Sequence, residues 1–448
     1  MPDANPASAK QAPGTRYAWY VVATLTAIYT LSYMDRTILS ILVGPIKRDL
    51  HVSDTKIGLL TGLAFTIFYT LLGLPMGRIA DSRSRRGLIT VGCVVWTIFT
   101  SACSASKGYW ALFATRVGVG VGESSLSPAA YSMISDLLPK EQLGLAISIY
   151  YMGVFFGTSL SQLVGGTTLD LLARTPVVTL PLLGAISSWR VVFLIVGLPG
   201  LLFAAWAYSL REPARKDLLR TATGAVSTLS FADALAQMKM RWQSLAGISL
   251  GMVFQSMCAF GYTFWGPSFF QRTYGWKPGE SGRALAAILL TFGCVGMYVG
   301  GRLADSWQKR GVTHAPLKVA LISAMGTGVF LPAAFLAGRP ELTLALMAPG
   351  VFFNALPMGI AAAALQRIFP NQVRGQISAL YLFILNLGGY PSGTLLPGIF
   401  NDYLFHDEKM LGASLALTVG GGAVLMLVVM ALTCRPYREH YLLMHPAA

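Results

Sequence analysis

The sequence predicts an all-α membrane protein in which twelve transmembrane helices form two pseudo-symmetric six-helix bundles. Three observations lead to this prediction. Hydrophobic residues make up 54% of the 448 residues and charged residues only 12%, whereas an ordinary soluble domain carries roughly 25% charged residues. Twelve stretches approach the ~20 apolar residues that a membrane span requires. A short motif also recurs at half the length of the chain, which indicates two related halves.

The predicted spans fall into two groups of six. The first six begin near Ala18, Thr55, Leu88, Tyr109, Leu143 and Trp189, and the others begin near Leu245, Arg283, Leu317, Leu342, Gln376 and Gly412. This pattern predicts a tail (1–17), a first bundle (18–210), a polar linker (211–244), a second bundle (245–434) and a second tail (435–448). The linker contains either a short amphipathic helix or a plain connection.

The distribution of basic residues predicts how the chain is oriented. If the N-terminus is cytoplasmic, 21 of the 34 Lys and Arg residues lie on the cytoplasmic side and 11 on the opposite side. This bias follows the positive-inside rule and places both termini in the cytoplasm. It also accounts for the net charge of +15 without a nucleic-acid partner.

The repeated motif lies in the turn after the second span of each half. Residues 77–87 read GRIADSRSRRG, and residues 301–311 read GRLADSWQKRG. The offset of 224 residues is half the chain length, so the sequence predicts a duplicated six-span unit.

Two six-span halves that share a Gly-x-x-x-Asp turn followed by basic residues resemble the major facilitator superfamily. The resemblance implies the major facilitator fold and a cytoplasmic gate built around the turn. The gate candidates are Gly77, Asp81, Arg85, Arg86, Gly301, Asp305, Lys309 and Arg310. Alternatively, the basic residues of the turn serve only to anchor the topology.

Four ionisable residues lie well inside predicted spans: Asp35 and Arg36 in the first, Arg116 and Glu123 in the fourth. Each charge at that depth costs at least ~2.5–3.5 kcal/mol, so pairing or function must compensate. Counting residues from the span ends places Asp35 at a depth between Arg116 and Glu123, which predicts one cluster. The second half has no counterpart at the same offset. Asp35 and Glu123 are candidates for proton coupling, with Arg36 and Arg116 as charge partners or as groups that hold an anionic headgroup. A static cluster that stabilises the two helices is the alternative.

Several segments further resemble the spinster-like branch, especially its bacterial members: Tyr-Met-Asp-Arg at 33–36, Arg-Val-Gly-Val-Gly-Val-Gly-Glu-Ser at 116–124 and Trp-Arg-Val-Val-Phe at 189–193. This resemblance implies that the four charged residues form the polar site and that the substrate is amphiphilic. It also implies a carrier in a bacterial inner membrane. A proton symporter for small organic anions, a multidrug efflux pump and a transporter-derived sensor remain alternatives.

The second half contributes polar and aromatic residues in its spans. The candidates for lining a central cavity are Gln255, Tyr262, Trp265, Tyr298, Asn354, Tyr381, Asn386 and Tyr390. The sequence contains no metal cluster, nucleotide loop or nucleophile–base pair, so we expect neither an enzyme nor a cofactor. The expected partners are a small amphiphilic or anionic substrate, protons and the lipid bilayer, and we expect a monomer.

Overall fold

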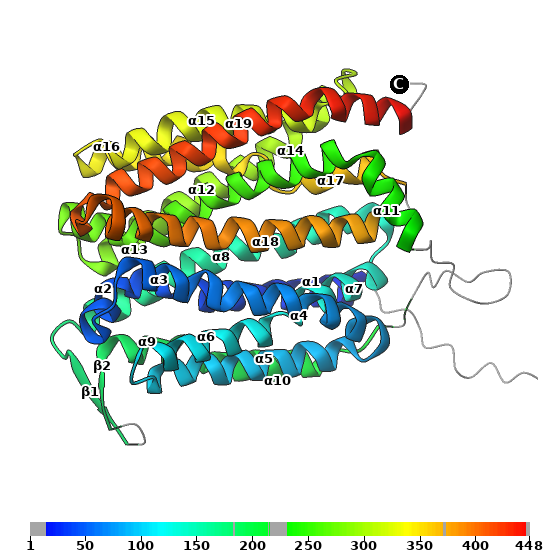
Figure 1. Cartoon of the computed structure of the whole chain (residues 1–448). Coiled ribbons are helices and arrows are strands. Elements are labelled where there is room, and N and C mark those ends of the chain that lie inside the picture. Colours follow the sequence, from blue (N-terminus) through cyan, green and yellow to red (C-terminus); the bar gives the residue numbers. More distant parts are fainter. Residues whose placement is uncertain (1–14, 182–183, 214, 216–230, 371–372, 445–448) are drawn as a thin grey trace, which may run out of the picture.

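The computed structural model describes residues 15–181, 184–213, 215, 231–370 and 373–444. Of the predicted tails and linker, residues 1–14, 214, 216–230 and 445–448 lie outside the described residues. Within the remainder, helical segments join end to end into twelve rods (Figure 1). The predicted start of each span lies within five residues of the start of one of these rods.

The first six rods are built mostly from paired helices. They comprise α1 (Thr15–Thr37) with α2 (Leu39–Leu50), α3 (Asp54–Thr61) with α4 (Leu63–Ser82), α5 (Arg85–Ala102), α6 (Tyr109–Glu123) with α7 (Leu126–Leu137), α8 (Lys140–Leu171), and α9 (Ser188–Gly197) with α10 (Pro199–Ser209). Two short strands, β1 (Val177–Leu180) and β2 (Gly184–Ser187), form an antiparallel hairpin between α8 and α9.

The second six rods follow helix α11 (Phe231–Met240), which lies within the predicted linker. They comprise α12 (Trp242–Tyr274), α13 (Pro278–Ile288) joined to α14 (Cys294–Lys309) by a π-helical turn (Leu289–Gly293), α15 (Ala315–Phe335), α16 (Pro340–Ala355) with α17 (Ile360–Ile368), α18 (Arg374–Ile399), and α19 (Leu411–Met444). The last two are linked by a π-helical segment (Phe400–Phe405) and a 3₁₀ turn (Glu408–Met410).

Nine continuous helical stretches in the described residues are long and apolar enough by themselves to cross a membrane. The remaining three of the twelve rods are α1–α2, α6–α7 and α18. All three contribute buried residues to the interior of the bundle. The fold prediction of an all-α, twelve-helix membrane protein is confirmed.

The two halves lie side by side with their rods nearly parallel (Figure 1). We call the end with α11 and the last residues of α19 the terminal end, and the end with β1 and β2 the hairpin end. Contacts between the halves include α3 against α18 and α8 against α13. They are close: a Cβ on Gly58 would lie 2.7 Å from the Thr394 carbonyl oxygen, and one on Gly166 would lie 2.7 Å from that of Pro278. Glycine therefore permits backbone contact between the halves toward the hairpin end.

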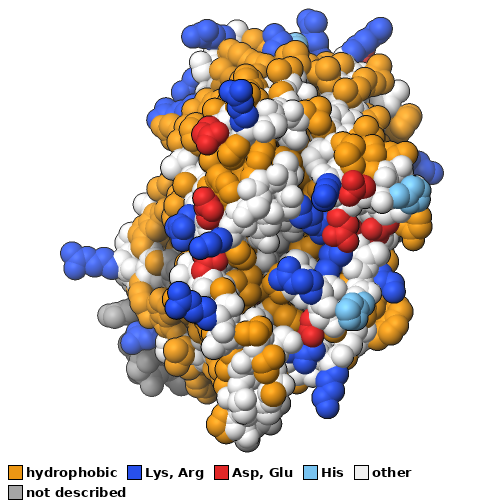
Figure 2. Space-filling view, turned by 90° about the vertical axis from the view of Figure 1, so that its left-hand side faces the viewer, with side chains coloured by type: hydrophobic (Ala, Val, Ile, Leu, Met, Phe, Trp, Pro, Cys, Tyr) orange, Lys and Arg blue, Asp and Glu red, His pale blue; other side chains and the backbone are white. Residues whose placement is uncertain are grey.

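On the face at the hairpin end, the acidic side chains lie inward of the rim, with basic side chains both among them and along the rim, and hydrophobic side chains cover much of the edges (Figure 2). Apolar edges and a polar end are the distribution expected for a bundle that is surrounded by lipid at its sides. The face in Figure 2 is also where the two halves meet.

Candidate functional site

The buried charges lie where two rods are interrupted. Helix α1 gives way to α2 at Ile38, just after Asp35 and Arg36, and α6 gives way to α7 directly after Glu123. Local hydroxyls satisfy carbonyls near these breaks: Thr37 donates to the Tyr33 carbonyl (2.7 Å) and Ser125 donates to the Gly122 carbonyl (2.9 Å). The side-chain and backbone polar groups of both rods therefore concentrate at one level of the first half.

Glu123 and Arg36 form a buried ion pair. Arg36 Nη2 donates to Glu123 Oε2 at 2.9 Å, and the Ser32 hydroxyl donates to the same oxygen at 2.7 Å. The Arg36 guanidinium also lies 4.4 Å from the ring centroid of Phe65 and 4.6 Å from that of Tyr69. A cation enclosed by aromatic faces keeps favourable electrostatic contacts even without water.

Asp35 and Arg116 do not pair through their charges. Arg116 donates to two backbone carbonyls, those of Asp35 (3.1 Å) and Arg36 (3.3 Å). The Asp35 carboxylate accepts a hydrogen bond from Thr100 at 3.3 Å, and its other oxygen has no hydrogen-bond partner among the described residues. The structure thus brings all four predicted residues together, as one ion pair, one arginine on backbone oxygens and one acid that forms no ion pair with a described residue.

The glycines of α6 place this helix against its neighbours. A Cβ on Gly120 would lie 2.5 Å from the Phe65 carbonyl oxygen, and one on Gly122 would lie 2.5 Å from the Trp96 backbone nitrogen. Gly118 faces the Phe99 ring at a similarly short distance. Because backbone meets backbone here, Arg116 and Glu123 are held at fixed positions relative to α4 and α5.

A group of tyrosines next to the charges was not predicted. Tyr29 stacks on Tyr150 with their ring centroids 4.3 Å apart and meets Tyr33 edge-on at 5.0 Å. Tyr131 lies edge-on to Tyr150 at 5.5 Å, and Tyr151 also joins the group. These rings come from α1, α7 and α8, so periodicity within one span gives no signal that they meet.

The polar residues of the second half divide into separate groups. Gln255 donates to the side chain (3.2 Å) and backbone carbonyl (2.9 Å) of Asn354, and Tyr262 donates to the same amide oxygen at 3.4 Å. The Trp265 indole donates to the Thr394 carbonyl at 2.8 Å. These contacts join α12 to α16 and to α18, so they stabilise the second bundle.

The other second-half candidates differ in position. Tyr390 packs edge-on against Phe260 (4.3 Å) and lies 6.3 Å from Phe65, whose ring contacts Arg36. Tyr381 is buried and Asn386 is partly buried on the same helix. Tyr298 is not brought to these groups: it is 62% exposed on α14 and accepts a hydrogen bond from Arg302.

The first copy of the turn motif forms a network at the terminal end. Arg85 is fully buried, donates to Glu212 at 2.8 Å, and also pairs with Asp136. Glu212 also accepts from the backbone nitrogen of Arg86 at 2.9 Å. Partial burial opposes ionisation of Glu212, but these hydrogen bonds outweigh burial, so the pKa of its carboxyl is lowered. The contacts of Asp81 involve its backbone carbonyl, which accepts from Arg215.

The second copy is arranged differently. Asp305, Lys309 and Arg310 are exposed, and together with Arg302 they line a shallow cavity at the end of α14. The motif glycines, Gly77 and Gly301, have open space around them, because a Cβ on either would meet no described atom within 4 Å.

A second ionic cluster, which we call the hairpin-end clasp (Lys47, Asp54, Arg272 and Glu408), joins the two halves. Arg272 binds both carboxylate oxygens of Asp54 (2.6 and 2.8 Å), and Lys47 binds Asp54 at 2.5 Å and Glu408 at 2.7 Å. Asp54 is fully buried and also accepts from Asn401 at 2.8 Å. Sequence reasoning missed this cluster because its members come from span ends that are far apart in the chain.

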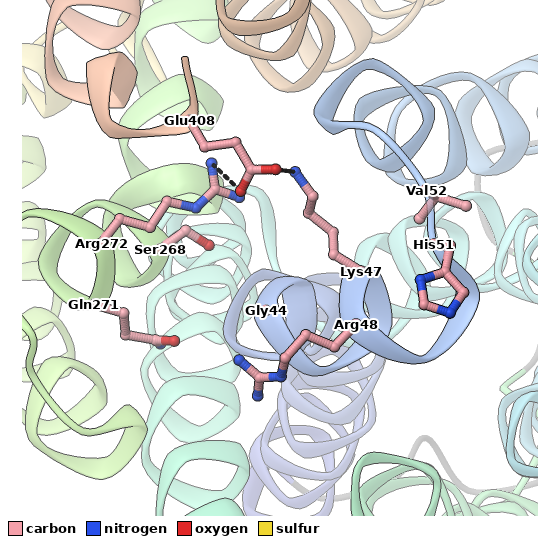
Figure 3. A pocket seen from close by; sticks show the side chains of 9 residues that line it. All are labelled: Gly44, Lys47, Arg48, His51, Val52, Ser268, Gln271, Arg272 and Glu408. Carbon is pink, nitrogen blue, oxygen red and sulfur yellow. Dashed lines mark hydrogen bonds and ion pairs between the residues drawn. The ribbon is translucent and has the colours of Figure 1, made fainter.

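The clasp borders a cavity of about 460 Å³ (Figure 3). Figure 3 shows Glu408 reaching between Lys47 and Arg272, with Arg48 and Gln271 on the opposite rim. Because Glu408 comes from the 3₁₀ turn between α18 and α19, that connection closes over the junction of the two halves.

Two six-helix halves, one of them with a cluster of buried charges, that are joined by ionic contacts at one end are the architecture of a membrane transporter. The chain belongs to the Major Facilitator Superfamily, whose family model matches residues 25–393. An "MFS-type efflux pump" of Mycolicibacterium smegmatis is 28% identical over 439 residues, covering 95% of each chain. A hexuronate transporter of Bacillus subtilis is 24% identical and covers 89% of this chain and 92% of its own.

A solved structure supports the finer resemblance. The crystal structure of a bacterial homologue of the human lysosomal transporter Spinster, in an inward-facing and unoccupied conformation, superposes with a TM-score of 0.74. It is 25% identical and covers 96% of this chain and 98% of its own. The predicted resemblance to spinster-like transporters is therefore confirmed, and the chain is a multi-pass membrane transporter.

Proposed function

We propose that this protein is a proton-coupled secondary transporter that moves an amphiphilic, lipid-like or organic-anion substrate by alternating access. The observation that carries the proposal is the arrangement of Asp35 beside the Arg36–Glu123 ion pair, all within the first half. A buried carboxylate that forms no ion pair is costly, so a proton on Asp35 relieves that cost. A change in the contacts of Arg36 would then alter whether Glu123 also holds a proton.

The contacts between the halves support alternating access. The hairpin-end clasp and the Gly58–Thr394 contact lie on the hairpin side of the charge cluster. Open space beside Gly77 and Gly301 at the terminal end leaves room for neighbouring segments to approach. Closure at that end with release of the clasp is the exchange that alternating access requires.

The surroundings of Arg36 favour a substrate with an anionic group and an apolar body. Its guanidinium lies against Tyr33, Phe65 and Tyr69, and the tyrosine group lies next to it. A cation for the headgroup and aromatic rings for the chain match an amphiphile.

A small organic anion is the second candidate, because a hexuronate transporter is among the relatives of this chain. Such a substrate would need Arg36 or Arg116 but little of the tyrosine group. Multidrug efflux and a sensor role are further outcomes that the substrate test below distinguishes.

The proposed setting is a bacterial inner membrane, with the terminal end in the cytoplasm and the protein acting as a monomer. The same proposal divides the chain into a first bundle (18–210), a linker (211–244) and a second bundle (245–434). On this orientation, the structure has its contacts between halves on the outer side.

The test is proton flux in proteoliposomes that contain the full chain, followed with a pH-sensitive dye and with solid-supported-membrane currents. The panel contains sphingoid bases, lysophospholipids, fatty acids, sugar acids and aromatic carboxylates. We expect Asp35→Asn and Glu123→Gln each to abolish proton-driven accumulation, while Glu123→Gln retains counterflow exchange. Glu280→Gln, an exposed acid at the start of α13, is the matched control and should behave as wild type.

Accumulation that is unchanged in both acid variants would contradict proton coupling through this cluster. A flux evoked by sugar acids but not by lipids assigns the substrate to the second candidate. Flux with structurally unrelated cationic drugs favours efflux, and ligand binding without any flux favours a sensor.

A further inference from the structure

The second copy of the turn motif presents a cluster of cations at the surface. Arg302, Lys309 and Arg310 line a cavity of about 290 Å³ together with Asp305 and Ser306. All three cations are exposed, and none of them forms an ion pair with a described residue. Arg302 instead donates to the Tyr298 hydroxyl at 3.0 Å and lies 5.4 Å from its ring centroid.

The first copy shows what these cations lack. Arg85, which corresponds to Lys309 by the 224-residue offset, is buried between the acids Asp136 and Glu212. The residues at the same offset from those acids are Ile360 and Pro436. The helix also continues through Lys309, whereas α4 ends at Ser82 and Arg85 begins the next helix. The protein therefore neutralises Arg85 itself, whereas its counterpart Lys309 and the neighbouring Arg302 and Arg310 remain available to an external anion.

An apolar surface continues from this cavity toward the middle of the rod. Phe292, Val295 and Tyr298 are 40%, 51% and 62% exposed. With Arg302 and Lys309 they follow one another at intervals of three, four or seven residues, so Val295, Tyr298, Arg302 and Lys309 share a helix face. The face changes along its length from aliphatic through aromatic to cationic.

The length of this face matches one leaflet of a bilayer. Val295 and Lys309 are fourteen residues apart, or roughly 21 Å along a helix at 1.5 Å per residue. Half of a bilayer with its headgroup regions measures roughly 20–22 Å. A cationic headgroup site at the end of such a face therefore lies at the level of lipid phosphates.

We propose that this face of α14 binds an anionic glycerophospholipid, with the phosphate on Arg302, Lys309 and Arg310 and an acyl chain along Val295 and Phe292. Three cations against one acid leave a net positive site, which selects a net anionic headgroup over a zwitterionic one. Asp305 lies one helical turn from Arg302 and from Lys309. Its carboxylate accepts a hydrogen bond from a headgroup hydroxyl, as phosphatidylglycerol offers. This site is independent of the transport substrate and of the direction of transport.

The experiment is native mass spectrometry of the full chain in detergent, titrated separately with phosphatidylglycerol, phosphatidylethanolamine, phosphatidylcholine and free glycerol 3-phosphate. The variant is R302A/K309A/R310A. The matched control is K107A/R174A/R339A, which removes three exposed cations at the hairpin end. We expect about 100-fold weaker phosphatidylglycerol binding in the variant, at about fivefold per cation, and wild-type binding in the control.

Tight phosphatidylglycerol adducts that are lost in the variant and kept in the control support the site. Equal losses in both triple variants would show that bulk charge alone attracts lipid, and would overturn it. Phosphatidylethanolamine bound as tightly as phosphatidylglycerol would overturn the anionic assignment. Glycerol 3-phosphate bound as tightly as the lipid would show that the apolar face contributes nothing, and would overturn the lipid assignment. Gel filtration confirms that each variant is folded.

Discussion

Replacing Asp54 by Asn should release the hairpin end of the protein. In the structure this carboxylate binds Arg272 through both oxygens, Lys47 through one, and the Asn401 amide through the other. Asparagine has nearly the same shape but carries no charge, and only one of its two polar atoms accepts hydrogen bonds. The substitution therefore removes the buried acid between Lys47 and Arg272 and leaves them with the exposed Glu408, which lies 2.7 Å from Lys47 and 4.0 Å from Arg272.

The magnitude follows from the burial of the partners. Removing one member of a fully buried ion pair costs about 3–5 kcal/mol. The Lys47 and Arg272 side chains are 10% and 14% exposed. Hydration of these two cations therefore offsets part of the lost interaction energy, and a cost of about 2–3 kcal/mol remains. That energy shifts the equilibrium between closed and open hairpin ends by ~30- to ~150-fold. An open population of ~1% would rise to ~20–60%.

The assay is a spin-label distance measurement between Lys107→Cys in the first half and Arg339→Cys in the second, in a background without Cys294 and Cys434. We expect the distance distribution of Asp54→Asn to gain a longer component.

The matched control is Asp49→Asn, the same chemical change at the same end. Asp49 contacts Trp189 and Arg190 within the first half, so its loss should not move one half against the other. A distribution that is identical in wild type and Asp54→Asn would refute the view that the clasp holds this end closed.

Four further outcomes are expected at other contacts. Glu123→Gln should abolish proton-driven accumulation in proteoliposomes, because the amide neither ionises nor forms an ion pair with Arg36. Unchanged accumulation would count against proton coupling through Glu123. Arg85→Ala should lower the free energy of unfolding by about 2–3 kcal/mol, whereas Lys309→Ala should lower it by at most about 0.5 kcal/mol. Thermal melts followed by fluorescence-detected gel filtration compare the two variants. Equal effects would contradict the asymmetry of the two motif copies. The lowered pKa of Glu212 stabilises the folded state above the unfolded pKa of ~4.3, and this contribution is lost as pH falls through the folded value. The wild-type melting temperature should therefore fall more steeply on acidification than that of Glu212→Gln, and parallel curves would argue against it. Gly122→Ala places a Cβ 2.5 Å from a backbone nitrogen of α5, so it should cost about 1–3 kcal/mol and lower the yield of folded protein; a wild-type yield and melting temperature would contradict this packing.

The spans and the charge cluster were predictable because each leaves a strong local signal. Twenty apolar residues have few uses other than a span, and a charge within one is rare enough to single out Asp35, Arg36, Arg116 and Glu123. Residue counting placed Asp35 at a depth between Arg116 and Glu123, and in the structure Arg116 contacts the Asp35 carbonyl while Glu123 pairs with Arg36. Residue counting could not show that Arg116 binds backbone carbonyls, because these carbonyls become available only where α1 gives way to α2. No proline or glycine at that interruption marks it in the sequence.

Contacts between the halves were not predictable for a different reason. Asp54 and Arg272 are 218 residues apart and lie at span ends, where charged residues are common. Nothing in either local sequence distinguishes a charge that pairs across the junction from one that faces water. Pairing depends on how two bundles approach each other, which is set by contacts such as Gly58 against Thr394 rather than by the charges themselves.

The uneven distribution of charge between the halves leads to a physical view of coupling. In the second half, the Gln255 amide donates to Asn354 and the Asn354 amide donates to the Gln255 carbonyl. The segments that carry these amides, 245–271 and 342–366, contain no Asp, Glu, Lys or Arg. One contact of the second half with the surroundings of the charges runs through Tyr390, whose ring lies 6.3 Å from that of Phe65, and Phe65 in turn contacts Arg36. If the halves rock, the aromatic surface beneath Arg36 changes first, and the Arg36–Glu123 pair must respond. The second half then acts on protonation through packing and not through charge.

Tyr390→Ala should weaken coupling between proton and substrate flux while leaving substrate binding largely intact, and a Tyr390→Phe variant should restore coupling because it keeps the ring. Coupling that needs the hydroxyl, and so fails in Tyr390→Phe, would show that the contact is polar and would refute this view.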